Sequence, residues 1–300
     1  MGTLDRHGRA RLHRRIGRSA LLIGAVLLLA WPTSLVDAVS PVTFTYTAAA
    51  NALVGIAPDA TAVADLNGDG KADLVVANHD NGTVSVLLGK GDGTFTSAPG
   101  SPITVGAGPV ALALADLNND GKKDLVVANQ DGNSISVLLG VGNGTFTAVG
   151  SPIPIASPTD VAVGDLNGDG KADLVVADSA FNTVHALRGN SDGTFTAFGA
   201  AIAVGAFPNA VALGDLNGDG HLDLAVANNG DSTISVLIGI GTGTFVPAST
   251  PTISVPEPPD ALAIGDLNGD GHPDIVTATG IPRGRVYSLL GNGDGTFLTP

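Results

Sequence analysis

One acidic nonapeptide recurs five times along the chain at almost constant spacing. Its first copy reads Asp-Leu-Asn-Gly-Asp-Gly-Lys-Ala-Asp over residues 65–73, and later copies begin at Asp116, Asp165, Asp215 and Asp266. The steps between successive starts are 51, 49, 50 and 51 residues. This period indicates a repeat architecture, because a unit of this size cannot bury its own apolar face and must stack on its neighbours.

Each repeat contains four segments that are typical of β-strands. In the second repeat an apolar run at 110–114 precedes the nonapeptide, and a strand-like segment at 124–128, apolar on both faces, follows it. An alternating segment at 134–139 and a short one at 145–147 come next, separated by Gly-rich turns. Four antiparallel strands in about 50 residues make the blade of a propeller. The sequence therefore predicts an all-β fold, a β-propeller of four-stranded antiparallel blades with five visible repeats.

A proline lies seven residues before each nonapeptide and marks the blade boundaries. We expect the blades to span about 59–108, 109–157, 158–207, 208–258 and 259–300. The segment 42–58 aligns without gaps to residues 93–109, which contain the outer strand of the first blade. We expect residues 42–54 to add a strand to the last blade and close a five-blade ring, which would hide both sheet edges. The alternative is that the chain is part of a seven-blade propeller.

The nonapeptide has side-chain oxygens at positions 1, 3, 5 and 9 and glycine at position 6. Calcium loops use this pattern, because the hard cation takes oxygen ligands and the chain must turn sharply around it. Position 7 is lysine or histidine, as expected if only its backbone carbonyl binds the ion. We predict up to five bound Ca²⁺ ions; the alternative is ordinary turns, which Asp, Asn and Gly also favour. The predicted metal ligands are Asp65, Asn67, Asp69, Lys71, Asp73, Asp116, Asn118, Asp120, Lys122, Asp124, Asp165, Asn167, Asp169, Lys171, Asp173, Asp215, Asn217, Asp219, His221, Asp223, Asp266, Asn268, Asp270, His272 and Asp274.

Two features separate these loops from EF-hands. Position 12, where an EF-hand has a bidentate glutamate, is valine or threonine, and strands rather than helices are predicted on both sides. Each copy also packs three aspartates into one turn, where like charges repel unless a counter-ion is present. The loop is therefore predicted to be a hairpin version that is closed by the aspartate at position 9.

The first 38 residues differ from the repeats. Six arginines precede an apolar stretch at 20–31, and a small-residue site ends at Ala38. This pattern predicts a signal peptide over residues 1–38 and a secreted or cell-surface mature protein over 39–300, with no membrane span after cleavage. An uncleaved anchor is the alternative. The mature chain would keep 8 basic and 26 acidic residues, a net charge of −18. Without a basic stripe, nucleic acid is excluded as a partner.

The strings Asp-Leu-Asn-Gly-Asp-Gly and Gly-Asp-Gly-Thr-Phe resemble the FG-GAP and VCBS repeat family, which includes the head of integrin α-subunits and many secreted bacterial proteins. The resemblance covers residues 42–300, although the literal FG and GAP strings survive only in degenerate form, as at 198–199 and 106–109. It implies a propeller with calcium in the hairpin loops on one face and ligand binding usually on the other.

We expect a non-enzymatic adhesion or interaction module for an extracellular protein or glycan. No catalytic motif stands out, and the mature chain's histidines form no evident zinc or triad pattern. The alternatives are a propeller domain of a polysaccharide-acting enzyme and a structural segment of a larger surface protein. The third repeat departs from the others at Phe181, His185 and Arg188, which predicts either a ligand spot or simple repeat drift. His79 and Phe207 fall on turns comparable to that of Phe181.

Overall fold

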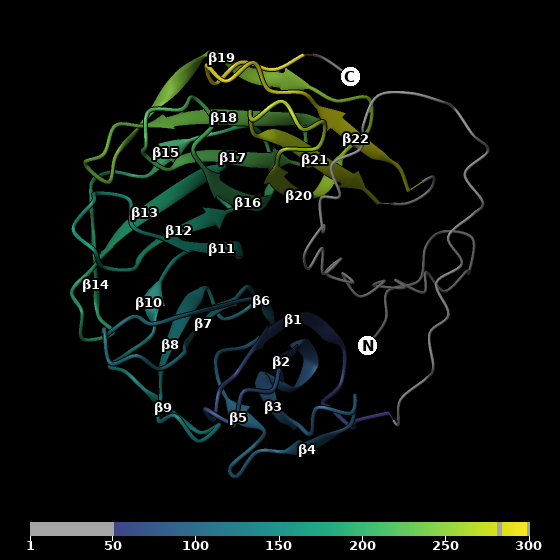
Figure 1. The fold of residues 1–300 in the computed structure, drawn as a ribbon, viewed down its shortest axis with the longest axis vertical. Helices are drawn as coiled ribbons and strands as arrows, with labels where there is room; N and C mark the ends of the chain where they lie inside the picture. Colours follow the sequence, from purple (N-terminus) through teal and green to yellow (C-terminus); the bar gives the residue numbers. More distant parts are fainter. Residues whose placement is uncertain (1–50, 281–283, 299–300) are drawn as a thin grey trace, which may run out of the picture.

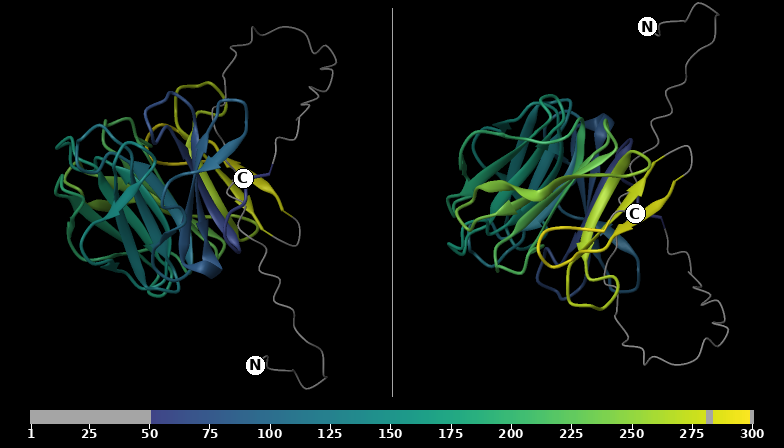
Figure 2. Two further views of the ribbon diagram at one scale, coloured as in Figure 1. Left: turned by 90° about the horizontal axis from the view of Figure 1, so that it is seen from below. Right: turned by 90° about the horizontal axis from the view of Figure 1, so that it is seen from above.

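A computed structural model describes residues 51–280 and 284–298 of the chain. These residues form five antiparallel sheets that follow one another around a common axis as the blades of a five-blade β-propeller (Figure 1). Seen from its side, the body has loops on both faces, with the strands running between them (Figure 2). The described residues include no helix of the length and apolarity that a membrane crossing requires. The prediction of an all-β propeller is confirmed.

Blade 1 sets the pattern for the others. Its strands run in the order β1(Pro58–Ala64), β2(Asp73–Asn78), β3(Thr83–Gly89) and β4(Phe95–Ser97), and β5(Ile103–Thr104) also pairs with β3. A single turn of 3-10 helix, η1(His79–Asn81), joins β2 to β3. The first strand of each blade is innermost and its last strands are outermost (Figure 1).

The remaining blades repeat this order with small changes. Blade 2 consists of β6(Pro109–Ala115), β7(Asp124–Asn129), β8(Ser134–Gly140), β9(Phe146–Ala148) and β10(Ile153–Pro154). Blade 3 consists of β11(Pro158–Gly164), β12(Asp173–Asp178), β13(Thr183–Gly189), β14(Phe195–Ala197) and β15(Ile202–Ala203). Blade 4 consists of β16(Pro208–Gly214), β17(Asp223–Asn228), β18(Thr233–Gly239) and β19(Phe245–Ser254). Blade 5 contributes β20(Pro259–Gly265), β21(Asp274–Thr279) and β22(Val286–Leu289).

The outer strand differs from the single short strand that the sequence predicts. In blades 1 to 3 it is broken into two pieces that both pair with the third strand, whereas in blade 4 it is continuous as β19. In blade 1 the break coincides with Gly100, whose φ of 77° departs from an extended strand. Blade 5 has three strands among the described residues, plus an isolated bridge between Gly291 and Phe297.

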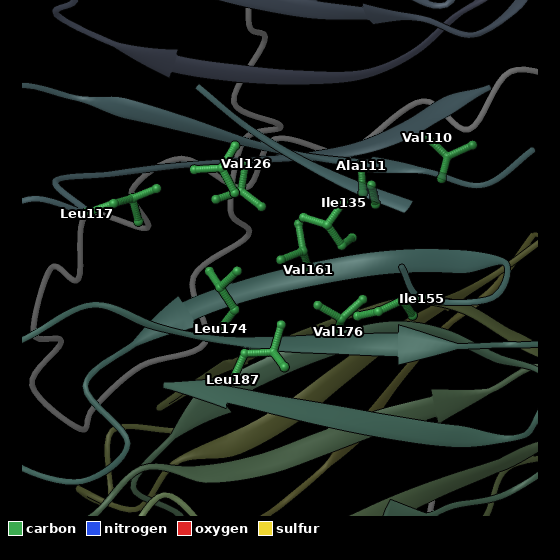
Figure 3. Close-up of a cluster of buried hydrophobic side chains, with 12 residues drawn as sticks. Val110, Ala111, Leu117, Val126, Ile135, Ile155, Val161, Leu174, Val176 and Leu187 are labelled. Carbon is green, nitrogen blue, oxygen red and sulfur yellow. The ribbon is translucent and has the colours of Figure 1, made fainter. Parts of the chain in front are cut away.

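The core lies between blades and not within them. The second strands β7, β12 and β17 are buried along their whole length, as their continuous apolar runs predict. Figure 3 shows one cluster, to which blade 2 contributes Val126 and Ile135. Blade 3 contributes Val161 and Leu174 to the same cluster (Figure 3). Three similar clusters join blades 1 and 2, 3 and 4, and 4 and 5. Each blade is therefore stabilised by its neighbours.

The exposed fraction of the leucine at position 2 of each loop shows whether the next blade packs against that loop. The first four of these leucines expose between 1 % and 5 % of their surface: Leu66, Leu117, Leu166 and Leu216. At three seams the next blade also donates a backbone hydrogen bond to the leucine carbonyl, as Gly144 N does to Leu66 O at 3.1 Å. Leu267 in the last loop is 47 % exposed. None of the described residues therefore covers the flank of blade 5 beyond this loop.

The predicted closing strand falls largely outside the described residues. Its residues 42–50 are not described, and residues 51–54 form no strand. Gly55 N donates to Asn78 Oδ1 at 2.9 Å, just as Gly106 N donates to Asn129 Oδ1 at 3.1 Å between blades 1 and 2. The chain thus enters blade 1 as it enters an internal blade. Closure of the ring by residues 42–54 stays a prediction.

A buried aspartate at position 9 of the loop ties three parts of each blade together. In blade 2 Asp124 Oδ2 accepts the N–H of Leu117 at 2.8 Å, and its Oδ1 accepts the N–H of Gly140 at 2.7 Å. These bonds join the start of the loop and the end of the third strand to the start of the second. The same pair of bonds recurs in all five blades.

We expect Asp124→Ala to lower the free energy of unfolding by about 2 to 5 kcal/mol without calcium, because two buried N–H groups would lose their acceptor. The exposed Asp120 of the same loop is the matched control, and its replacement by alanine should have a much smaller effect in chelator. Urea denaturation of both variants measures this difference. Equal losses would show that the aspartate at position 9 has no structural role of its own.

We expect Leu117→Ala to cost about 2 to 5 kcal/mol, as for other buried leucines. Leu267→Ala should cost far less, because this side chain is already half exposed. Urea denaturation of the two variants side by side measures the contrast. A loss at Leu267 as large as that at Leu117 would mean that another part of the protein covers the last flank in solution.

Candidate metal centres

All five nonapeptides lie on one face of the propeller. Each connects the first strand of a blade to the second, as residues 65–73 connect β1 to β2. The turns between the third and outer strands lie at the same end of the blades. We call this the loop face. The opposite side, the turn face, carries the turns between second and third strands and the connections from blade to blade.

The side chains of each loop fold inward over its backbone. In the first loop Asp65 accepts the N–H of Gly68 through Oδ1 and the N–H of Gly70 through Oδ2, both at 2.8 Å. Asn67 Oδ1 accepts the N–H of Asp69 at 2.9 Å, and Asp69 Oδ1 accepts the N–H of Lys71 at 2.9 Å. Gly70 has a φ of 78°, a conformation that glycine adopts at little cost. Positions 1, 3 and 5 are thus arranged around one tight turn.

The second oxygen of the position-5 aspartate is held by a nearby donor. In the first two loops this donor is the lysine at position 7, which lies 3.1 Å from Asp69 Oδ2 and 3.2 Å from Asp120 Oδ2. In the other three loops the amide of the asparagine at position 3 donates instead, at 2.8 to 3.1 Å. Arg188 also lies 3.4 Å from Asp169. The exposed side chains of each loop are therefore held close together by contacts within the loop.

Position 9 has a different environment from positions 1, 3 and 5. Its aspartate is fully buried in every loop, below the exposed turn, and each oxygen accepts one backbone N–H as described for Asp124. Each carboxylate oxygen has a further lone pair, so these bonds leave acceptor capacity for an ion. The sequence predicted this residue as a ligand but did not reveal its structural role.

The two environments shift the carboxyl pKa values in opposite directions. The hydrogen bond from the N–H of Gly70 lowers the pKa of Asp65 below its ordinary value. The N–H of the residue at position 7 does the same for Asp69 and Asp120. Burial raises the pKa of the position-9 carboxyls Asp124 and Asp173, against the effect of their N–H donors. The second, third and fourth loops therefore combine a position-5 carboxyl of lowered pKa with a buried position-9 carboxyl of raised pKa.

The donor chemistry of the loops fits a hard cation. Among the described residues no three His, Cys, Asp or Glu side chains form a group that could hold a metal ion. The predicted set is not limited to these residue types, since it includes the asparagine at position 3 and the carbonyl at position 7. All of its donors are oxygens, which suit Ca²⁺ and not a soft or borderline metal. The calcium assignment stays a prediction.

The predicted ligand spot in blade 3 is wrong in its geometry. Phe181 is 70 % exposed in the turn between β12 and β13, on the turn face. Arg188 lies near the other end of β13, beside Asp169 on the loop face. An extended strand rises about 3.3 Å per residue, so the two side chains lie at opposite ends of β13 and form no compact common site. His185 lies between them, with Nε2 3.2 Å from Asp178 Oδ2.

His79 lies in the turn between the second and third strands, as Phe181 does, but it is buried. It is 7 % exposed, with Nδ1 2.9 Å from Asp80 and Nε2 3.6 Å from Asp131 of the next blade. The single turn of η1 folds it back against the seam between blades 1 and 2.

Sequence reasoning missed a buried asparagine at the end of the second strand. Asn129 Nδ2 donates to Ser136 Oγ at 2.9 Å, while its Oδ1 accepts the N–H of Gly106 from the incoming connection. Asn78 makes the same contacts in blade 1, and Asn228 makes the side-chain ones in blade 4. The signal was available, because an asparagine ends the same apolar run in three repeats.

The comparisons with known proteins concern family and fold. The sequence matches the FG-GAP-like repeat in four overlapping copies, over residues 65–127, 116–176, 165–226 and 215–277. No curated protein matches the sequence.

Two solved structures illustrate the likeness in fold. A functionally unknown protein from Desulfotomaculum acetoxidans DSM 771 has a TM-score of 0.61 and 15 % identity, over 82 % of this chain and 70 % of that one. A protein from Bacteroides uniformis ATCC 8492, provisionally assigned as a 6-phosphogluconolactonase, has a TM-score of 0.62 and 17 % identity, over 81 % and 69 %. At such identities the likeness shows the fold alone. Because the repeat matches more than half of the sequence and its copies fold as successive blades, the chain belongs to the FG-GAP-like repeat family.

Proposed function

We propose that this protein is a calcium-stabilised propeller that acts outside the cell as an adhesion or interaction module for a protein or a glycan. The observation that carries the proposal is the fivefold repetition of one inward-folded oxygen cluster on a single face. An extracellular location is proposed from the arginine-rich and apolar segment at the start of the sequence.

In each loop the side chains at positions 1, 3 and 5 and the carbonyl at position 7 would hold the ion from above. The buried aspartate at position 9 would hold it from below through its remaining lone pairs. A bound cation would offset the repulsion among three carboxylates in one turn. Since the position-9 aspartate also bonds to the third strand, ion binding would be coupled to the packing of the blade.

The charge of the chain supports the same proposal. Its formal net charge is −14 at neutral pH, and fifteen of its acidic residues are loop aspartates. Self-repulsion of this size destabilises a compact state unless counter-ions are bound. Millimolar calcium is the extracellular cation that the all-oxygen donor set would select.

Calcium should raise the thermal stability of the mature protein. For site Kd values of about 10⁻⁵ to 10⁻⁴ M and about 1 mM free Ca²⁺, each occupied loop would contribute about 1.4 to 2.7 kcal/mol. Thermal unfolding in calcium and in chelator should differ by many degrees, with Mg²⁺ as the ion control. Coincident midpoints would show that the loops are ordinary turns.

A single substitution can test the predicted calcium site of one loop. Asp219→Ala takes away the position-5 carboxylate of the fourth loop and should reduce the number of bound Ca²⁺ ions by one, together with part of the calcium-dependent rise in midpoint. Asp192→Ala removes a carboxylate from the same face outside the nonapeptides, so it should leave the calcium stoichiometry unchanged. Isothermal titration calorimetry counts the ions. Equal effects of the two changes would indicate unspecific attraction to an acidic face.

The interaction role needs a partner test. Calcium-loaded protein should bind defined ligands on an array of extracellular proteins and glycans, and chelator should weaken this binding by destabilising the blades. Binding to nothing on the array, by protein that is folded and calcium-loaded, would favour a purely structural segment.

A further inference from the structure

Two exposed phenylalanines lie together on the turn face, where blade 3 meets blade 4. Phe181 is 70 % exposed in the turn before β13, and Phe207 is 46 % exposed just before β16. Asn182 joins their two segments: its Oδ1 accepts the N–H of Phe207 at 2.8 Å, and its carbonyl accepts the N–H of Val204 at 3.0 Å. The two aromatic side chains therefore project from adjacent, hydrogen-bonded backbone.

Phe207 occupies a backbone position that disfavours a large side chain. Its φ is 55°, in the left-handed region. Ala57, Gly108 and Ser157 occupy the corresponding positions before the first strands of blades 1, 2 and 3, with φ values of 53°, 61° and 41°. Blade 5 has Pro258 at this position, and the proline ring fixes a negative φ there. Small residues suit that conformation, whereas a bulky residue there is strained. Among the four blades whose first strand follows a residue in this conformation, blade 4 alone has an aromatic residue there.

Hydrogen bonds from blade 4 hold this strained segment in place. Phe207 O accepts the N–H of Asn229 at 3.0 Å, and Ala206 O accepts the N–H of Gly230 at 2.9 Å. Asp231 Oδ2 accepts the N–H of Ala206 at 2.9 Å. The backbone is fixed by these contacts, while 46 % of the Phe207 side chain remains exposed. Backbone strain that the surrounding structure maintains clusters at functional sites.

The position of Phe181 points the same way. The corresponding turn residues of blades 1, 2 and 4 are polar or glycine: Asn81, Gly132 and Asp231. Exposed apolar side chains that occur singly need no explanation, but here two aromatic side chains come from different segments at one seam. Folding alone accounts for neither of them.

The charge around this pair favours a cationic ligand. All five lysines of the chain lie in loop-face segments, and Arg188 also points to that face. Arg285 is the one described arginine on the turn face, and it lies 3.6 Å from Glu257. Carboxylates are frequent there, and two of them are exposed near Phe207: Asp231 bonds to its neighbour Ala206, and Asp260 accepts from Asn229 at 2.7 Å.

We propose that Phe181 and Phe207, with Asp231 and Asp260, form a docking site for an arginine- or lysine-bearing segment of a partner protein. Cationic side chains are attracted to the faces of aromatic rings, and the carboxylates supply complementary charge. The inference rests on the proposed interaction role and assigns it a surface, away from the calcium loops. A neutral glycan could also stack on the rings but would gain nothing from the carboxylates.

The test uses fluorescent peptides that share one Gly-Ser framework and carry arginine, glutamine or glutamate at the same positions. Binding to the mature protein is measured by anisotropy in saturating Ca²⁺, so that the loop carboxylates are neutralised. The arginine peptide should bind at least about tenfold more tightly than the glutamine peptide, and added salt should weaken its binding. The glutamate peptide should not bind.

The variants assign this binding to the seam between blades 3 and 4. Phe181→Ala and Phe207→Gly should each weaken binding of the arginine peptide by about tenfold or more, as for interface hot spots. Asp231→Asn should weaken it by a smaller factor. Ser157→Gly makes a matched change at the neighbouring seam and should leave it unchanged. Because glycine relieves the left-handed strain, Phe207→Gly should unfold at the same temperature as the wild type or at a higher one.

Four results would overturn the inference. The first is no preference for arginine over glutamine. The second is arginine binding that Phe181→Ala and Phe207→Gly leave intact. The third is a lower unfolding midpoint in Phe207→Gly, which would make Phe207 a packing residue. Phe-dependent capture of neutral glycans, without charge dependence, would also reject it. If any of these results is found but the protein still binds partners on the array, only the docking site is rejected and the proposed interaction role stands. If the wild-type protein binds nothing on the array, the interaction role itself is rejected.

Discussion

The structure depends on apolar contact between neighbouring blades. A four-stranded sheet of these short strands has two faces to bury, and the second strands β7, β12 and β17 are buried on both. The clusters that bury them draw side chains from two blades each. Removal of blade 2, 3 or 4 would therefore expose the faces of two others. The same requirement explains why the exposed Leu267 marks a flank that is chemically unlike every internal seam.

The acidic loops are attached to this packed core through their aspartate at position 9. Their aspartate at position 9 is buried because it accepts N–H groups from the loop start and from the end of the third strand. The aspartates at positions 1 and 5 stay outside and turn their oxygens onto the loop backbone. The hydrogen bonds within the loop thus form a frame that does not depend on a bound ion. In the proposed function, calcium would strengthen this frame, which lowers the cost of ordering the loop around the ion.

In the proposed function, the departures from symmetry are the places where a partner could be recognised. A propeller built of near-identical repeats offers the same groups at every seam, so a specific binding surface needs positions where one repeat differs. Phe181 and Phe207 are such positions, on the face that the acidic loops do not occupy. His185 and Arg188 also differ from their counterparts, but contacts within the blade engage them: Asp178 pairs with the first and Asp169 with the second.

The sequence by itself determined the architecture and the composition of the loops. Periodicity, proline spacing and apolar runs are local properties, so they predicted the blades, the strand order and the loop that joins β1 to β2. They could not show which distant groups meet. The tertiary structure decided that Asp124 bonds to Gly140, that Phe181 and Arg188 lie at opposite ends of a strand, and that Phe207 is held in a left-handed conformation. Each of these depends on how one strand or blade stacks on the next, and the physical reason is that such contacts join residues far apart in the chain.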